Sequence, residues 1–243
     1  MNRKAWFACL AGVSLAVSQA SASVVLFDDF DGDSLDLSKW QVVTGTGGSI
    51  VQENGHVTTN YGPGRSYLVT VEQWNPADGA LVITGRTSSL PDSFVITSRA
   101  TPTLDSAGLP NDGGVLGGGL MAMYWRNGEL LTILEKTDAV WPWVEVVSPA
   151  IVPNSGDATL WDFTYIDDGF NISITVTNVA NPGNTVTHTA TSSFSSGFYH
   201  VAITNVNGGF DYIQISQVPE PASMALVGIG AMFMLRRSRR SQG

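Results

Sequence analysis

Short runs of Val, Ile, Thr and aromatic residues fill the chain from residue 23 to residue 217, and Gly, Asn, Asp and Pro break them at intervals. In the run FNISITVT, residues 170–177, apolar and polar residues alternate, so a strand built from it has one buried face and one wet face. We find no long stretch with helical period and no internal repeat of the kind that propeller blades show. The pattern therefore predicts an all-β domain, folded as a two-sheet antiparallel sandwich or jelly roll.

Two hairpins are predicted within this domain. In the first, the runs LMAMYW and LLTILE flank the turn RNGE, where Asn127 and Gly128 suit the positive φ angles of a type I′ turn. In the second, ATLWDFTYI is joined to FNISITVT through Asp167, Asp168 and Gly169. The longest irregular segment, residues 101–119, has the composition of a surface loop.

The first 22 residues have the pattern of a secretory signal peptide. Arg3 and Lys4 precede an apolar stretch at residues 5–17, and small residues at 20–22 form a cleavage-type site. Because a bilayer-spanning helix needs roughly 20 apolar residues, a retained anchor is the weaker alternative. The only cysteine, Cys9, lies inside this segment. The exported part has no cysteine, which excludes disulfides, thiolate metal sites and cysteine nucleophiles from it.

The exported body is strongly acidic. The whole chain holds 12 basic and 21 acidic residues, for a net charge of −9. Six of the basic residues lie in the signal segment or among the last eight residues, so the body between them is more acidic than the whole. Such a balance repels phosphates and anionic lipid, which excludes nucleic acid as a partner and favours cations and neutral polymers.

Residues 218–243 have three parts in a fixed order. The sequence Pro219, Glu220, Pro221 is followed by an apolar run at residues 222–235 and then by a basic cluster. The cluster consists of Arg236, Arg237, Arg239 and Arg240. This order resembles the PEP-CTERM sorting signal. The resemblance implies that exosortase, a membrane enzyme, processes the tail during export in Gram-negative bacteria that make exopolysaccharide.

The physical character of the tail agrees with such a use. Its 14-residue apolar run rises only about 21 Å as a helix, short of a hydrocarbon core of about 30 Å. Residues 222–235 are therefore expected to form a short transmembrane segment, with the arginines holding its far end in the cytoplasm. Proline on either side keeps Glu220 in an extended, accessible peptide. We expect a transient membrane-anchored precursor whose tail is removed, and the alternative is an ordinary tail anchor.

The body carries a second resemblance, at its two ends. It opens with VVLFDDFDGDSLDLSKW, continues with NPADGALVITGR and closes with FDYIQIS. These segments resemble concanavalin A-like lectin and glucanase domains, in particular the laminarinase-like glycoside hydrolases. The matching residues are Asp28, Asp29, Phe30, Asp31, Gly32, Leu35, Asp36, Trp40, Gly79, Leu81, Ile83 and Arg86. The resemblance implies a concanavalin A-like jelly roll for residues 23–217.

The same enzyme family carries the motif E-x-D-x-x-E on one strand, where one carboxylate attacks the sugar and another protonates the leaving oxygen. This chain has no such motif. The nearest carboxylates lack its spacing, and they are Glu129, Glu135, Asp138 and Glu145. We therefore predict no catalytic residue, while an unrelated carboxylate pair stays open.

The segment WPWVE is the candidate glycan-binding feature. Trp141, Trp143 and Glu145 fall on one side of an extended segment, and Pro142 suits an edge or a loop. Flat aromatic faces beside a carboxylate suit the C–H face and the hydroxyls of a sugar ring. The alternative is that one or both indoles pack beneath a neighbouring loop.

Asp29 and Asp211 are the candidate ligands of a structural calcium ion. Jelly rolls that this chain resembles often bind calcium between the first strand and the last. Asp211 is expected on the Ile213 side of its strand, where a lone carboxylate needs a partner. The alternative is that these carboxylates cap turns by accepting hydrogen bonds from backbone amides.

These features together predict an exported, non-enzymatic β-sandwich that reaches the cell surface or the extracellular matrix. There it would bind polysaccharide or serve as a structural component. One alternative is a glycoside hydrolase or lyase that acts on polysaccharide. Another is a structural adhesin that binds a protein through an edge of the sandwich.

Overall fold

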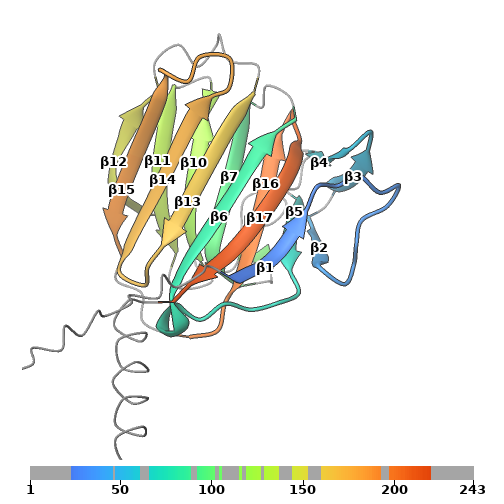
Figure 1. Cartoon of the computed structure of the whole chain (residues 1–243), viewed down its shortest axis with the longest axis horizontal. Coiled ribbons are helices and arrows are strands. Elements are labelled where there is room, and N and C mark those ends of the chain that lie inside the picture. Colours follow the sequence, from blue (N-terminus) through green and yellow to red (C-terminus); the bar gives the residue numbers. More distant parts are fainter. Residues whose placement is uncertain are drawn as a thin grey trace, which may run out of the picture.

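The computed structural model describes residues 23–45, 47–60, 66–88, 92–101, 104–105, 115–116, 119–126, 129–136, 144–152, 160–192 and 197–219. The predicted signal peptide, the tail from Glu220 onward, Trp141 and Trp143 lie outside these ranges. Within them the chain forms two large antiparallel sheets that pack face to face (Figure 1). This confirms the predicted all-β sandwich.

One sheet has eight strands. Its order, from one edge to the other, is β15 (Thr185–Thr191), β14 (Asn171–Asn178), β13 (Trp161–Asp167), β6 (Ala80–Thr87), β17 (Phe210–Val218), β4 (His56–Asn60) and β3 (Ser49–Glu53). The first strand, β1 (Ser23–Asp28), pairs with the C-terminal half of β17. A 3-10 turn, η1 (Pro76–Asp78), leads into β6.

The other sheet has seven strands. Its order is β12 (Val144–Ile151), β11 (Leu130–Lys136), β10 (Gly119–Trp125), β7 (Ser93–Ala100), β16 (His200–Val206), β5 (Ser66–Thr70) and β2 (Trp40–Thr44). A separate two-stranded sheet joins β8 (Leu104–Asp105) to β9 (Val115–Leu116). That pair lies within residues 101–119, for which the sequence predicted only a surface loop.

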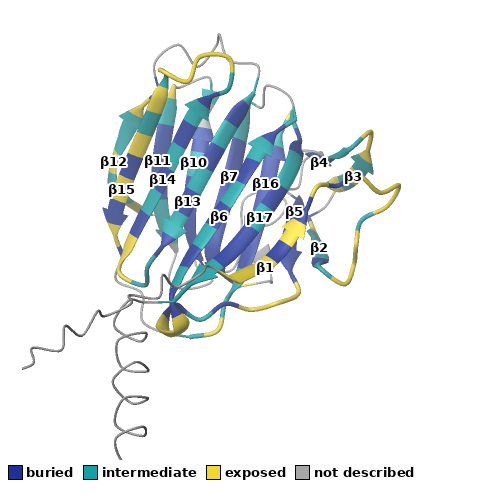
Figure 2. Cartoon of the chain, viewed as in Figure 1, coloured by how far each residue is buried: buried dark blue, intermediate teal, exposed yellow. Residues whose placement is uncertain are grey.

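Side chains that alternate along the strands build the core between the sheets. On β13 every second residue is buried, from Trp161 through Phe163 and Tyr165 to Asp167 (Figure 2). Aromatic rings meet across the interior, with centroids 5.2 Å apart for Phe94 and Phe163 and 5.3 Å apart for Tyr124 and Trp161. Such contacts stabilise beyond the area they bury, and they fix the two sheets against each other.

Both predicted hairpins are present in the strand pairing. Strands β10 and β11 pair antiparallel with Trp125 opposite Leu130. Strands β13 and β14 pair antiparallel from Asp167, opposite Ile172, to Trp161, opposite Asn178. Gly169, in the turn that joins them, has a φ of +93°. The period-two pattern therefore located these strands correctly, and the first predicted turn, at Asn127 and Gly128, lies outside the described residues.

The opening motif of the body has a structural basis. Asp28 is buried at the end of β1 and accepts a hydrogen bond of 2.7 Å from the indole N–H of Trp40. It also accepts the backbone N–H of Phe30 at 3.0 Å. Phe30 and Trp40 are themselves fully buried. Asp28, Phe30 and Trp40 of this motif thus fix the start of the described body to the core.

The start of β1, the first described strand, lies beside the end of β17, the last one. Ser23 lies opposite Gln217 on β17, and Val218 lies opposite Ala80 on β6. The Gln217 side-chain amide donates a hydrogen bond of 2.9 Å to the carbonyl of Asn75. No helix within the described ranges is long and apolar enough to cross a membrane, and the predicted segment 222–235 lies outside them.

Candidate functional site

Glu145 belongs to a row of residues that lie opposite one another across the strands of the seven-stranded sheet, on its outer face, and it is the one acid in that row. Cross-strand pairing runs from Glu145 through every strand of the sheet. The other members of the row are Leu134, Met121, Thr97, Ala202, Val69 and Gln41. None of these row neighbours is an acid, so this row does not by itself supply the second carboxylate that a two-carboxylate mechanism needs.

Glu145 itself is an exposed residue near the start of β12, which is an edge strand. Its neighbour Val144 is also exposed. Of the three residues predicted to bind glycan, the structure describes only this one. Trp141 and Trp143 come directly before β12 in the sequence and lie outside the described residues.

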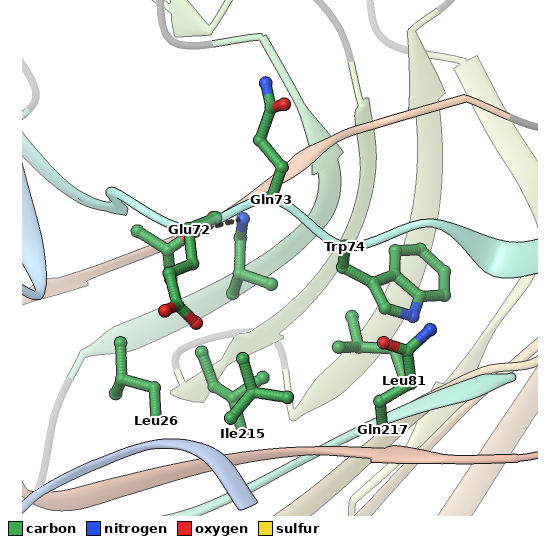
Figure 3. A pocket seen from close by; sticks show the side chains of 10 residues that line it. Leu26, Glu72, Gln73, Trp74, Leu81, Ile215 and Gln217 are labelled. Carbon is green, nitrogen blue, oxygen red and sulfur yellow. Dashed lines mark hydrogen bonds between the residues drawn. The ribbon is translucent and has the colours of Figure 1, made fainter. Parts of the chain in front are cut away.

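A hollow opens at the end of the sandwich where β1 and β17 meet (Figure 3). Its lining is mostly apolar and comes from both sheets, and includes Val25, Leu26, Trp74, Leu81, Val201 and Ile215. Thr70, Glu72, Gln73 and Gln217 contribute its polar groups.

Trp74 forms a wall of this hollow. Its indole N–H donates a 3.3 Å hydrogen bond to the carbonyl of Gly79, and its backbone pairs with Tyr199 in both directions. Only 6% of the side chain is exposed. A tryptophan held in this way supports the junction between the sheets and has little free ring surface for stacking.

The outer face of the eight-stranded sheet is rich in hydroxyl groups. One row across neighbouring strands consists of Thr187, Thr175, Thr164 and Thr84, followed by Gln214 on β17. The hydroxyls of Thr175 and Thr187 lie 2.8 Å apart, and those of Thr177 and Thr185 lie 3.0 Å apart. The outward positions of β14 and β15 carry no charge, which is unusual for so acidic a chain.

A fixed ion pair lies beside this hydroxyl row. The Arg86 guanidinium donates to both carboxylate oxygens of Asp162, at 2.6 Å and 2.9 Å. The hydrogen bond that Arg86 donates to Asp162 raises the pKa of Arg86. Burial raises the pKa of the nearby Asp211, with the positive charge of Arg86 partly opposing it. Asp211 sits at an irregularity in β17, between Phe210 and Tyr212, which removes it from the Ile213 side predicted from simple alternation.

The predicted calcium ligands do not form a metal cluster by themselves. Asp29 is exposed, and the residue that is buried in its stretch is Asp28. Asp211 has Arg86 as its nearby countercharge. The described residues contain no group of three or more His, Cys, Asp or Glu side chains placed to hold a metal ion. Calcium binding at Asp29 and Asp211 would therefore depend on backbone carbonyls and water for most of its ligands.

A buried ion pair joins the two sheets near the ends of β7 and β13. Arg99 donates to Asp167 through two nitrogens, at 2.6 Å and 2.9 Å, and neither side chain is exposed. Ser98 donates to the same carboxylate at 2.6 Å and lies 2.7 Å from the Tyr165 hydroxyl. Burial raises the pKa of that hydroxyl, so it stays protonated. Sequence reasoning missed this cluster, because no local motif marks residues on separate strands.

Comparison with known families identifies the tail. A family model described as the PEP-CTERM protein-sorting motif matches residues 217–240. The chain therefore carries this sorting motif, which indicates an exported protein that is sorted to the cell envelope. No curated protein matches the chain by sequence.

Solved structures share the fold of the body at low sequence identity. The CBM2 module of the evolved Dit protein of Lactobacillus casei BL23 phage J-1 has a TM-score of 0.51 and 7% identity, covering 82% of this chain and 97% of that one. A β-1,3-1,4-glucanase (lichenase) from a mouse hindgut metagenome has a TM-score of 0.50 and 10% identity, covering 79% and 99%. The exoplasmic/lumenal domain of VIP36, in its metal-free form, has a TM-score of 0.51 and 9% identity, covering 77% and 90%. The fold is the concanavalin A-like jelly roll that the sequence predicted.

Proposed function

We propose that the chain is an envelope protein whose sandwich binds a neutral polysaccharide after exosortase has processed its tail. The observation that carries the proposal is the junction between the two parts. Strand β17 pairs with β6 up to Val218, and the sorting motif already begins at residue 217. With no spacer between them, the sandwich is the cargo that the motif delivers. We place that cargo at the surface or in the exopolysaccharide matrix of a Gram-negative cell.

The charge and the surface of the sandwich support a neutral glycan as the partner. A net charge of −9 repels anionic polymers, so hydrogen bonding and stacking have to supply the affinity. The hydroxyl row on the eight-stranded sheet offers donors and acceptors without charge. Solved relatives with this fold include a protein named as a carbohydrate-binding module and one named as a glucanase. Those names suggest the class of ligand for this chain.

Two surfaces are candidates for the glycan. The first is the predicted platform of Trp141, Trp143 and Glu145 at the edge strand β12, where Glu145 is exposed. The second is the hydroxyl row centred on Thr164. Indole stacking provides more affinity per residue than surface hydroxyls do, so we assign binding to the first surface.

Trp143→Ala is expected to weaken binding to a neutral β-glucan about tenfold, because it removes a rigid stacking face. Affinity gel electrophoresis with the glucan in the gel measures the change. Thr164→Lys is the comparison, since it places a bulky charge in the centre of the hydroxyl row. If Trp143→Ala migrates like the wild type while Thr164→Lys is no longer retarded, the glycan binds the eight-stranded sheet and the platform assignment is wrong.

The hydrolase or lyase alternative is tested separately. The chain has no E-x-D-x-x-E motif, so we expect no new reducing ends when the protein is incubated with a panel of β-glucans. Glu145→Gln serves as the control for any trace activity. Release of reducing ends by the wild type and its loss in Glu145→Gln would replace the binding proposal with a catalytic one.

Asp211→Asn tests the burial of that carboxylate and the calcium proposal together. Because burial raises its pKa above 3.8, the folded state binds this proton more tightly than the unfolded state, and stability falls as pH rises through the folded pKa. In the presence of a chelator the variant should therefore melt at least as high as the wild type at pH 7. A lower melting temperature would contradict this account.

The calcium prediction is tested by adding calcium. If calcium raises the melting temperature of the wild type but not that of Asp211→Asn or of Asp29→Asn, the two residues are calcium ligands.

A further inference from the structure

Exposed apolar side chains gather at the end of the sandwich where the chain leaves it. We call this end the tail-end face, and it comprises Val24, Val25, Val71, Phe170 and Phe198. They are five of the eleven large hydrophobic residues that are exposed in the described part of the chain. Exposed apolar residues scattered singly need no explanation, but a group at one end marks a contact surface.

The pairing of backbone segments brings these residues to one place. Phe170 follows Gly169, which lies close to η1, because a Cβ added at Gly169 would be 3.3 Å from Pro76. Asn75 directly precedes η1, and its carbonyl accepts a hydrogen bond from Gln217. Phe198 precedes Tyr199, whose backbone pairs with Trp74. Val25 lines the hollow together with Trp74 and Gln217. Val71 lies, in the sequence, between two other residues that line it. In Figure 1, the ends of β13 and β17 and the start of β1 lie at this same end of the molecule.

The tether between this face and the apolar tail is very short. Pro219 is the last described residue, and the apolar run begins at residue 222. The intervening peptide spans about 10 Å at most, since an extended residue covers roughly 3.5 Å. Ser23 lies opposite Gln217, so the predicted signal peptide would also leave from here. Whichever apolar segment enters a bilayer, the tail-end face is held against the lipid.

We propose that the tail-end face is a lipid-docking surface, which seats Phe170 and Phe198 in the headgroup region while the chain is still attached to its tail. This inference rests on the proposed insertion of residues 222–235. Aromatic side chains favour the boundary between headgroups and acyl chains, and a short tether makes their local concentration at the bilayer high. Docking in this orientation holds Pro219 and the rest of the sorting motif at the membrane surface, where a membrane enzyme can reach them.

The charge of this face selects the kind of lipid. Glu72 and Asp78 are exposed beside the apolar residues. Burial alone would raise the pKa of Asp168, but hydrogen bonds from Asn171 and Phe170 together outweigh it and lower the pKa, so this carboxylate is charged as well. Carboxylates repel an anionic surface. The apolar side chains must therefore drive docking, and a zwitterionic bilayer is the favoured partner.

The experiment uses the full chain in phosphatidylcholine vesicles, with Cys9→Ser as the background and one added cysteine carrying an environment-sensitive dye. The dye is placed at Phe170→Cys or, as the matched control, at Ile151→Cys. Phe170 is 71% exposed and Ile151 is 68% exposed. Ile151 lies at the opposite end of the sandwich, because its row leads through Leu130, Trp125 and Ser93 to Val206.

Vesicle flotation first reports whether the tail inserts, independently of docking. Headgroup-labelled quencher lipid is then expected to remove about half of the emission at residue 170 and almost none at residue 151. Adding anionic phosphatidylglycerol should reduce the quenching at residue 170. Flotation with equal, weak quenching at both positions would overturn docking and leave tail insertion intact. A dye at residue 170 that is shielded without lipid, in proportion to protein concentration, would show that this face binds a second copy of the chain instead.

Discussion

Arg99→Met is expected to lower the free energy of unfolding by about 3–5 kcal/mol, because it leaves the carboxylate of Asp167 buried without its partner. Arg99 and Asp167 join the two sheets through two hydrogen bonds, and neither side chain is exposed. The charge of Asp167 would then be held only by Ser98 and by the backbone N–H of Gly169. Urea unfolding followed by tryptophan fluorescence measures the loss.

Arg86→Met is the matched control for this prediction. The Arg86–Asp162 pair has the same two-nitrogen geometry, but more than a third of each side chain is exposed. Solvent screens such a pair, so its removal should cost about 1 kcal/mol or less. The double variant Arg99→Met/Asp167→Leu should recover most of the loss, because it removes both buried charges. An Arg99→Met loss no larger than that of Arg86→Met would mean that the buried pair contributes no more than the surface pair.

Gly79→Ala is expected to destabilise the sandwich and to disturb the start of the sorting motif. Gly79 has a φ of +138°, which strains any residue with a Cβ. The added methyl would also overlap the carbonyl oxygen of Val218 and lie 2.8 Å from the Cα of Pro219. The last residues of β17 must therefore move away from β6, which lowers the free energy of unfolding by roughly 1–3 kcal/mol. Thermal unfolding measures this effect on stability.

The same variant has a consequence for processing. Displacing Val218 and Pro219 changes how the motif is presented, so a smaller fraction of the chain should lose its tail in cells that contain exosortase. Immunoblots of precursor and processed forms measure that fraction. Gly32→Ala is the control, since its Cβ would meet only ordinary contacts of 3.4 Å or more. If Gly79→Ala melts lower but is processed like Gly32→Ala, the junction does not influence recognition of the motif.

The strands and hairpins could be predicted because their signals are local. Alternation along residues 170–177 and the turn at Gly169 depend on neighbours in the chain, and the structure follows both. Pairings between distant segments have no such signal. Ser23 lies opposite Gln217 and Arg99 contacts Asp167, yet nothing in the intervening sequence indicates either partner. The irregularity at Asp211 likewise moves one side chain off the face that alternation assigns to it.

The candidate site was predictable in composition more than in placement. The acidic stretch at the start of the body suggested a metal site at Asp29, whereas the buried carboxylate is Asp28, which bonds the Trp40 indole. Sequence alone cannot tell two adjacent aspartates apart, because their burial depends on how β1 pairs with β17. Glu145 is exposed on an edge strand, and the predicted glycan platform that it shares with Trp141 and Trp143 stays a prediction, since those two residues lie outside the described part of the chain. The hydroxyl row emerges only when four strands are aligned in register.

Calorimetric titration of the full chain with polysaccharides of opposite character tests the central proposal most directly. The ligands are a neutral β-glucan and an anionic polysaccharide of similar length, at physiological ionic strength. We expect saturable binding of the neutral polymer and none of the anionic one, since the acidic sandwich repels the latter. Binding of the anionic polymer alone, or of no glycan in a broad neutral panel, would contradict the assignment of this envelope protein as a neutral-glycan binder.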